Sequence, residues 1–189
     1  EDVLRDSGLL ILAVPDYRLC FDQFRPVTGL AQVLDAHHYS RQIHTPGAVL
    51  ECFINQSKKN GSFTWKKNTI TRDNKLFNSI ETSINLYNSA KNSSEYIDIH
   101  NWCFTPSSFE LIIHDLQMLS LTKLRTVEIH QNKTFEFVVV LKKEMAPVKT
   151  QEMRLELLEK VQEELRHAPC RKGLRGRLKR LWKSITHSV

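Results

Sequence analysis

The chain has 189 residues, enough for one domain with an appendage, and its 41% hydrophobic and 25% charged residues exclude a wholly disordered or collagen-like protein. No apolar run approaches the length of a membrane-spanning helix. Residues 170–189 carry seven basic and no acidic residues, which accounts for the net charge of +6. Residues 1–169 therefore carry about −1 and give no electrostatic argument for nucleic-acid binding.

The first predicted element is a strand. Leu9–Val14 is a continuous apolar run that follows Gly8 and ends at Pro15. Such a run is typical of a strand that is buried on both faces in the middle of a parallel sheet. A central strand needs neighbours on both sides, so we expect an exposed sheet edge, open to self-association, where a neighbour is missing.

The middle of the chain is predicted to be largely helical. Apolar residues three and four positions apart indicate helices over residues 28–39, 48–54 and 75–91. The polar stretch at 55–74 predicts a loop with a short strand at 63–65. The alternating sequence at 96–102 predicts either a short strand or an extended segment that leads to the next helix.

The strongest local pattern is a helix start at Thr105. Thr105 is a capping residue, and Pro106 occupies the first helical position, where its missing N–H costs nothing. Two strands, at 124–130 and 135–142, are predicted to form a hairpin because both favour extended structure and only a short turn separates them. A charged helix is predicted at 150–167.

Several of these segments resemble class I S-adenosylmethionine-dependent methyltransferases. VLRDSGLLILAVP at 3–15 is similar to the family's passage from a helix, through a glycine turn, into the fifth strand. The motifs PDYR at 15–18 and FDQFRP at 21–26, followed by HNWCFTPSSF at 100–109, are similar to a bacterial subgroup with a large insertion after that strand. Members of this subgroup often occur with sugar-polymer biosynthesis. The resemblance covers roughly residues 3–143.

The resemblance implies an α/β fold with a partial Rossmann-like sheet. One parallel strand would be followed by a C-terminal hairpin whose second strand lies reversed between the family's fifth and sixth strands. It divides the chain into a methyltransferase part at 1–143, a charged helix at 144–169 and a basic amphipathic tail at 170–189. The methyltransferase part includes a largely helical insertion at 17–101, which would bind an acceptor such as a carbohydrate or nucleotide sugar in the cytoplasm.

The family holds its S-adenosyl-L-methionine on a glycine-rich turn after the first strand. No G-x-G-x-G sequence follows a strand here, and the six glycines are isolated. We therefore expect the chain to correspond to the C-terminal part of such an enzyme. The methyl donor would be bound by sequence not present in it, and the isolated chain would be inactive.

The candidate acceptor-binding residues follow the predicted buried strand, because ligands of open α/β sheets bind beyond the carboxyl ends of the strands. Asp16, Tyr17 and Arg18 occupy this position. Asp22 and Arg25 lie close together in sequence. Arg25 could grip a carboxylate or phosphate of the acceptor, or the two could form an internal ion pair that holds the insertion against the sheet.

His100 and Trp102 alternate on one face of the predicted strand at 96–102. His100 is the candidate base for the acceptor's proton, and Trp102 could stack on a sugar or aromatic ring. The alternative is a core histidine beside a packing tryptophan. The histidines 37, 38 and 44 form the only cluster of their kind, but no carboxylate or cysteine completes a metal site.

The tail suggests a second, non-enzymatic function. Its apolar residues fall on one helical face among basic residues, as in helices that dock on an anionic membrane surface or an acidic partner. The candidate contact residues are Arg175, Lys179, Trp182 and Lys183. The four widely spaced cysteines are expected to be free thiols.

Overall fold

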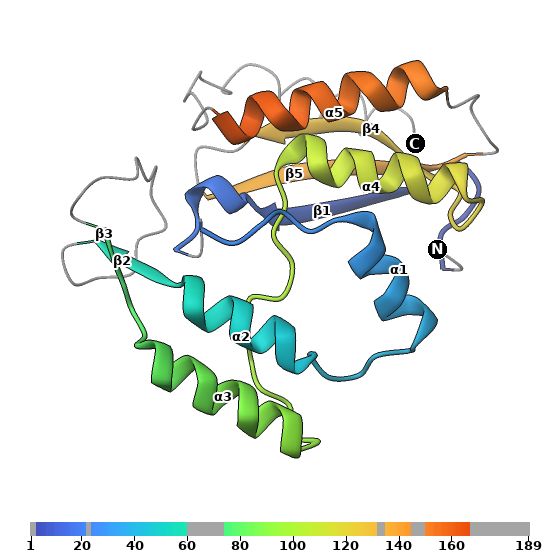
Figure 1. The fold of residues 1–189 in the computed structure, drawn as a ribbon. Helices are drawn as coiled ribbons and strands as arrows, with labels where there is room; N and C mark the ends of the chain where they lie inside the picture. Colours follow the sequence, from blue (N-terminus) through green and yellow to red (C-terminus); the bar gives the residue numbers. More distant parts are fainter. Residues whose placement is uncertain (1–2, 22–23, 60–73, 132–134, 145–149, 167–189) are drawn as a thin grey trace.

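The computed structural model describes residues 3–21, 24–59, 74–131, 135–144 and 150–166, and the structural statements below concern these residues. The chain is a mixed α/β protein with a three-stranded antiparallel sheet (Figure 1). The strands are β1 (Leu9–Pro15), β4 (Leu124–Gln131) and β5 (Glu136–Lys143). Their order is β1-β5-β4, so the second strand of the hairpin lies between the other two, as predicted.

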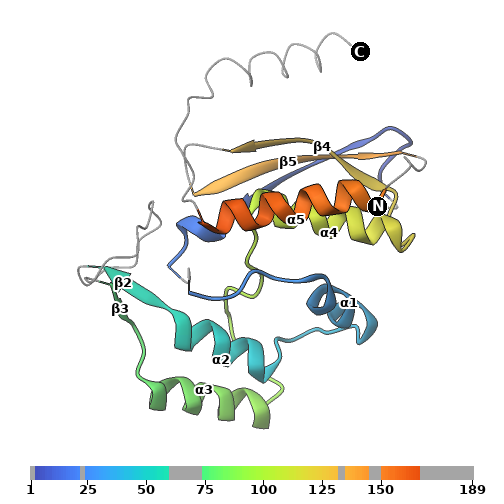
Figure 2. The ribbon, with the colours of Figure 1, turned by 45° about the horizontal axis from the view of Figure 1, so that its top comes forward.

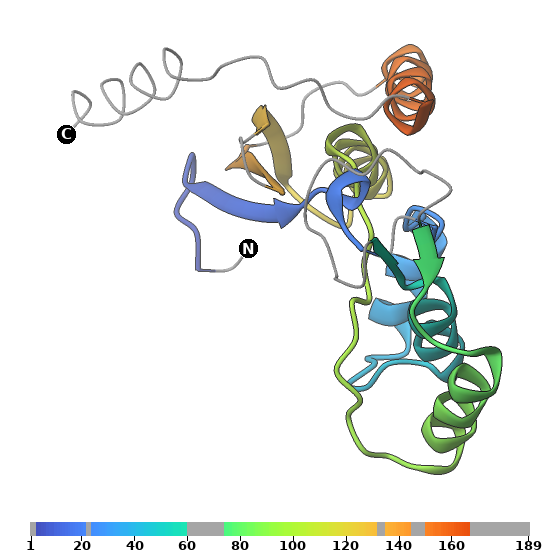
Figure 3. The same cartoon turned by 90° about the vertical axis from the view of Figure 1, so that its left-hand side faces the viewer.

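Two helices cover one face of the sheet, as Figure 3 shows: α4 (Pro106–Met118) and α5 (Gln151–Arg166). Thr105 caps α4 as predicted, accepting a hydrogen bond from the backbone of Ser108. The apolar core lies between α4 and the sheet. Its most buried side chain is Phe137, which is 0% exposed. The burial of this apolar surface is what positions the helices.

The prediction that β1 is buried on both faces is wrong for the described structure. Leu10 and Leu12 pack against the core cluster, whereas Leu9 and Ile11 are 42% and 55% exposed on the opposite face. β1 pairs antiparallel with β5, and no strand of the described residues pairs with its other edge. Self-association through this edge stays a prediction.

The insertion forms a separate helical layer next to the sheet and its helices (Figures 1 and 2). After a 3₁₀ turn, η1 (Tyr17–Leu19), it contains α1 (Leu30–His38), α2 (Pro46–Asn55), the small strands β2 (Ser57–Lys59) and β3 (Asn74–Leu76), and α3 (Ile80–Asn92). β2 and β3 pair antiparallel, and α2 packs against α3. The predicted strand at 63–65 lies outside the described residues.

The helix predicted over 75–91 begins later, at Ile80, because residues up to Leu76 pair with β2 and Ser79 supplies the helix cap. Two apolar residues of this helix, Ile80 and Ile84, are 58% and 45% exposed. The fully buried residue of this helix is Ser83, whose hydroxyl donates to the Ser79 carbonyl. A small side chain at this position is compatible with close packing against α2.

Of the two alternatives predicted for residues 96–102, the structure has the extended segment, without strand pairing. Its carbonyls instead accept hydrogen bonds from a side chain of the insertion. At its end, Phe104 makes an isolated parallel bridge with Asp16, and the Tyr17 amide donates to the Phe104 carbonyl over 2.8 Å. This bridge joins the segment to the carboxyl end of β1.

Candidate functional site

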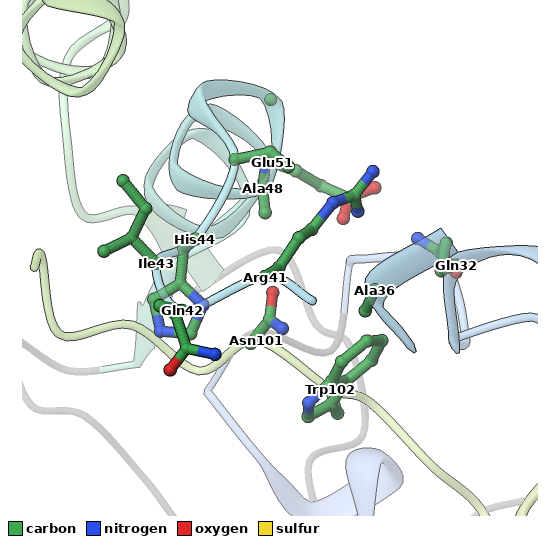
Figure 4. A pocket seen from close by; sticks show the side chains of 12 residues that line it. Gln32, Ala36, Arg41, Gln42, Ile43, His44, Ala48, Glu51, Asn101 and Trp102 are labelled. Carbon is green, nitrogen blue, oxygen red and sulfur yellow. Dashed lines mark hydrogen bonds between the residues drawn. The ribbon is translucent and has the colours of Figure 1, made fainter. Parts of the chain in front are cut away.

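A pocket of about 440 Å³ opens between α1, α2 and the segment at 101–102 (Figure 4). The side chains with polar or aromatic groups that line it are Gln32, Arg41, Gln42, His44, Glu51, Asn101 and Trp102. Of the residues predicted to bind an acceptor, only Trp102 lines this pocket. Its side chain is partly accessible, with the residue 39% exposed. The pocket therefore combines one aromatic surface with amide and charged groups.

Arg25 is a buried clamp behind the pocket. It is 3% exposed, and its guanidinium donates to the main-chain carbonyls of His100 and Asn101, the latter over 2.9 Å. It also lies 3.4 Å from the Glu51 carboxylate. Of the two roles predicted for Arg25, this geometry corresponds to the internal ion pair and not to ligand binding. The described partner is Glu51, whereas the predicted partner was Asp22. Asp22, its predicted neighbour, lies outside the described residues.

Thr28 holds the same segment by bonding to the backbone of Cys103, the residue after Trp102. The Cys103 amide donates to the Thr28 hydroxyl, and the Thr28 amide donates to the Cys103 carbonyl, both over 2.9 Å. Both residues are buried. The backbone on either side of Trp102 is therefore fixed by Arg25 and Thr28, and the indole is presented to the pocket by hydrogen bonds that form only in the folded chain.

Arg41 reaches the pocket through a tight turn at the end of α1. Ser40 adopts φ 46°, and the amides of Ser40 and Arg41 donate to the carbonyls of His37 and Ala36, each over 3.1 Å. This left-handed ending satisfies the last carbonyls of the helix and reverses the chain. The Arg41 guanidinium lies 5.5 Å from the centre of the Tyr39 ring. Within the described part of the chain it forms no ion pair.

His44 precedes α2 and contacts Tyr96 across the pocket rim. Its Nε2 lies 3.2 Å from the Tyr96 hydroxyl, and the two ring centres are 5.0 Å apart. Partial burial lowers the pKa of His44, and the nearby Asp98 opposes this effect. The neutral imidazole is therefore favoured, which suits a hydrogen-bonding role at the rim.

Asp16 and Arg18 do not face this pocket. Asp16 is fully buried and accepts hydrogen bonds from Arg18 Nε at 2.9 Å and Arg18 Nη2 at 2.6 Å. Its other bonds come from the Arg18 amide and from Gln131 at the end of β4. These contacts join the ends of β1 and β4, so the carboxylate supports the sheet and has few lone pairs left for a ligand.

Tyr17 and His100 also lie outside the lining of the pocket. Tyr17 sits in η1, half-buried, with its amide bonded to Phe104. His100 stacks on Phe21, with ring centres 5.5 Å apart and planes at 24°. The predicted shared face of His100 and Trp102 depended on strand alternation, which is absent here. The structure thus separates the candidate base from the candidate stacking residue.

The lining residues that sequence patterns did not indicate are Gln32, Arg41, Gln42, Glu51 and Asn101. They come from α1, α2 and the connections around them, so no local spacing unites them. Of these five, only Asn101 could have been suggested by the sequence, because it lies between the candidate residues His100 and Trp102. The tail residues Arg175, Lys179, Trp182 and Lys183 lie outside the described residues, and docking through the tail stays a prediction.

The described residues contain no cluster of three or more side chains suited to a metal ion. The thiols of Cys20, Cys52 and Cys103 are buried and form no disulfide among the described residues, as expected, while Cys170 is not described. No helix in the described ranges is both long and apolar enough to cross a membrane.

No protein-family model, curated protein or solved structure matches the chain.

Proposed function

We propose that this chain is the C-terminal part of an S-adenosylmethionine-dependent methyltransferase and that its helical insertion binds the acceptor, a carbohydrate or nucleotide sugar. The observation that carries the proposal is the strand order β1-β5-β4 with β5 antiparallel to both neighbours. It is the order that the resemblance implies for the last three strands of a class I methyltransferase sheet.

The position of the pocket supports an acceptor site. Asn101 and Trp102 line it, and the chain runs from them through Phe104 to the bridge with Asp16 at the carboxyl end of β1. Ligands of open α/β sheets bind near such strand ends. A methyl acceptor held by the insertion would therefore lie close to the carboxyl end of β1, the side of the sheet on which open α/β proteins bind their ligands.

The chemistry of the lining supports a sugar-containing acceptor. The accessible indole of Trp102 offers a flat apolar surface for a sugar or a base, and the amides of Gln32 and Asn101 can donate to and accept from hydroxyl groups. Arg41, without an ion pair in the described residues, suits the paired oxygens of a phosphate or carboxylate.

The described residues do not fit the methyl donor. Gly8 precedes β1, Gly29 caps α1 and Gly47 lies within α2, so none forms a glycine-rich turn after a strand. We therefore propose that this chain contributes the acceptor side and that S-adenosyl-L-methionine is bound by sequence outside it. Calorimetric titration of the chain with S-adenosyl-L-methionine should then give no binding heat.

The acceptor site can be tested by saturation-transfer NMR with glucose, glucuronic acid and UDP-glucose. We expect binding of at least UDP-glucose, and Trp102→Ala should weaken it about three- to tenfold because a stacking surface is lost. Phe77→Ala is the matched control, since Phe77 is 45% exposed and does not line the pocket. Arg41→Gln should weaken UDP-glucose and leave any glucose binding unchanged.

Two results would contradict the proposed acceptor site. One is that no member of the panel binds the folded wild-type chain. The other is that Trp102→Ala and Phe77→Ala affect binding equally, which would place the ligand outside the pocket.

A further inference from the structure

A second, smaller cavity lies on the other side of the molecule, between α4, β4 and α5. It does not share residues with the acceptor pocket, and its interpretation does not depend on methyl transfer. Its volume is about 90 Å³. It is lined by the apolar side chains of Ile113, Met153 and Leu157, by His114 and Thr126, and by Glu110, Glu156 and Lys160.

Two polar atoms of this lining have no partner. His114 Nε2 and Thr126 Oγ1 are buried, and neither has a hydrogen-bond partner among the described residues. His114 is only 1% exposed. Buried polar atoms are almost always satisfied in folded proteins, because leaving them unpaired costs free energy. Because both residues line the same cavity, a small polar ligand held there is in a position to bond to these two atoms.

The rest of the His114 ring defines what that partner must offer. Nδ1 lies 3.2 Å from Asp115 Oδ1, and the same carboxylate accepts from Arg154 Nε at 2.9 Å and Arg154 Nη2 at 3.1 Å. Because the carboxylate acts as an acceptor, Nδ1 must be the donor. Nε2 then accepts a hydrogen bond in the neutral form of the ring and donates one in the charged form. The missing partner must therefore be able both to donate to Nε2 and to accept from it.

Water is the ligand that meets these requirements. It can donate to His114 Nε2 and can either donate to or accept from the Thr126 hydroxyl. A water molecule takes about 30 Å³ in the liquid, so a cavity of this volume has room for about three. The described side chains include no group that could hold a metal ion here.

We propose that this cavity is a structural water site in which at least one ordered water bonds to both His114 Nε2 and Thr126 Oγ1. The water joins α4 to β4 beneath α5. Direct contacts fix α5 on either side of the site: Arg154 binds Asp115, and Glu164 accepts from the Ser107 amide and hydroxyl at 3.0 and 2.9 Å. The contact between α4 and β4 is thus partly mediated by solvent, whereas α5 is held by direct contacts.

The substitution Thr126→Val tests the proposal by the sign of the change in Tm, because valine has the same shape without the hydroxyl. If water occupies the site, it loses a partner, and we expect Tm to fall by about 2–4 °C. If the cavity is empty, the substitution removes an unsatisfied buried hydroxyl, and Tm should stay the same or rise. Val127→Thr is the control on the same strand, at a position 40% exposed, and should change Tm little.

A crystal structure of the wild-type chain gives an independent readout even if Thr126→Val does not fold. Electron density for water within hydrogen-bond distance of His114 Nε2 is expected. Density that shows an empty cavity, or a protein group bonded to Nε2, would overturn the proposal.

Discussion

In the three strands of the sheet, here called the sheet body, the buried side chains are apolar: Phe137, Val139 and Leu141 are at most 2% exposed. In the insertion, Val49 and Cys52 are buried, but so are the polar residues Arg25, Thr28, Ser57 and Ser83. Arg25, Thr28 and Ser57 bond to backbone groups of other segments, as Ser57 does to the Phe21 carbonyl over 2.9 Å, whereas Ser83 bonds to Ser79 at the start of its own helix. The body is thus stabilised mainly by apolar burial, whereas the insertion depends on a few specific hydrogen bonds.

This contrast matters because the two kinds of stabilisation respond differently to substitution. Apolar cores tolerate changes that preserve volume and patterning, and they lose stability roughly with the volume removed. A buried polar group that loses its hydrogen-bond partner destabilises the fold by its full desolvation penalty. The acceptor pocket lies in the insertion. We therefore expect substitution of Arg25 or Thr28 to unfold the region around the pocket while the sheet stays folded.

The largest effect is expected for Phe137→Ala. Removal of this fully buried ring should lower the free energy of unfolding by about 3–5 kcal/mol, because it leaves a cavity at the centre of the sheet body. Urea unfolding followed by circular dichroism measures this loss. Phe77→Ala, at an exposed ring, should change it by less than about 0.5 kcal/mol. Equal losses for the two variants would contradict the placement of the core.

Arg25→Met comes next and acts on the insertion. It removes the donor to the carbonyls of His100 and Asn101 and leaves Glu51 without its cation, so we expect a loss of about 2–4 kcal/mol. Native-state hydrogen exchange should show α2 losing more protection than β5. Lys91→Met, at an exposed position in α3, is the control. If α2 and β5 lost protection equally, the insertion would not be stabilised independently of the sheet.

A smaller effect is expected for Thr28→Val, which removes the hydroxyl that accepts from the Cys103 amide. The buried amide is then unsatisfied, at a cost of about 1–2 kcal/mol. Thermal unfolding of this variant can be compared with that of Thr82→Val, where the hydroxyl is exposed. A Thr28→Val protein as stable as the control would show that the Thr28 bond does not hold the segment beside Trp102.

The smallest effect concerns pH. The pKa of His44 is lowered by burial from its ordinary value of 6.5, so the unfolded chain binds this proton more readily than the folded one. The stability contributed by the neutral ring is present in full above that ordinary value and is lost as the pH falls through the lowered pKa. His44→Gln should therefore reduce the loss of stability between about pH 7.5 and pH 5, measured by urea unfolding. An unchanged pH dependence would contradict the shift.

Local patterns in the sequence were sufficient for most of the elements. Thr105 and Pro106 define the start of α4 because capping depends on neighbouring residues only. The residues of β4 and β5 predict a hairpin because extended propensity and a short turn are also local. For residues 96–102 the sequence could not decide between a strand and an extended segment, since alternation cannot show that Arg25, some 75 residues earlier in the chain, bonds to the carbonyls of His100 and Asn101.

The site depends on contacts that no local pattern contains. Trp102 was identified from its alternation with His100, but Arg41 and Glu51 join it only because α1 and α2 fold onto the segment at 101–102. The buried roles of Asp16 and Arg25 were decided in the same way, by partners distant in the chain. Residue types and spacing thus determined which segments are helical or extended, while long-range hydrogen bonding and packing decided which polar side chains stay accessible, because burial depends on what lies opposite in space.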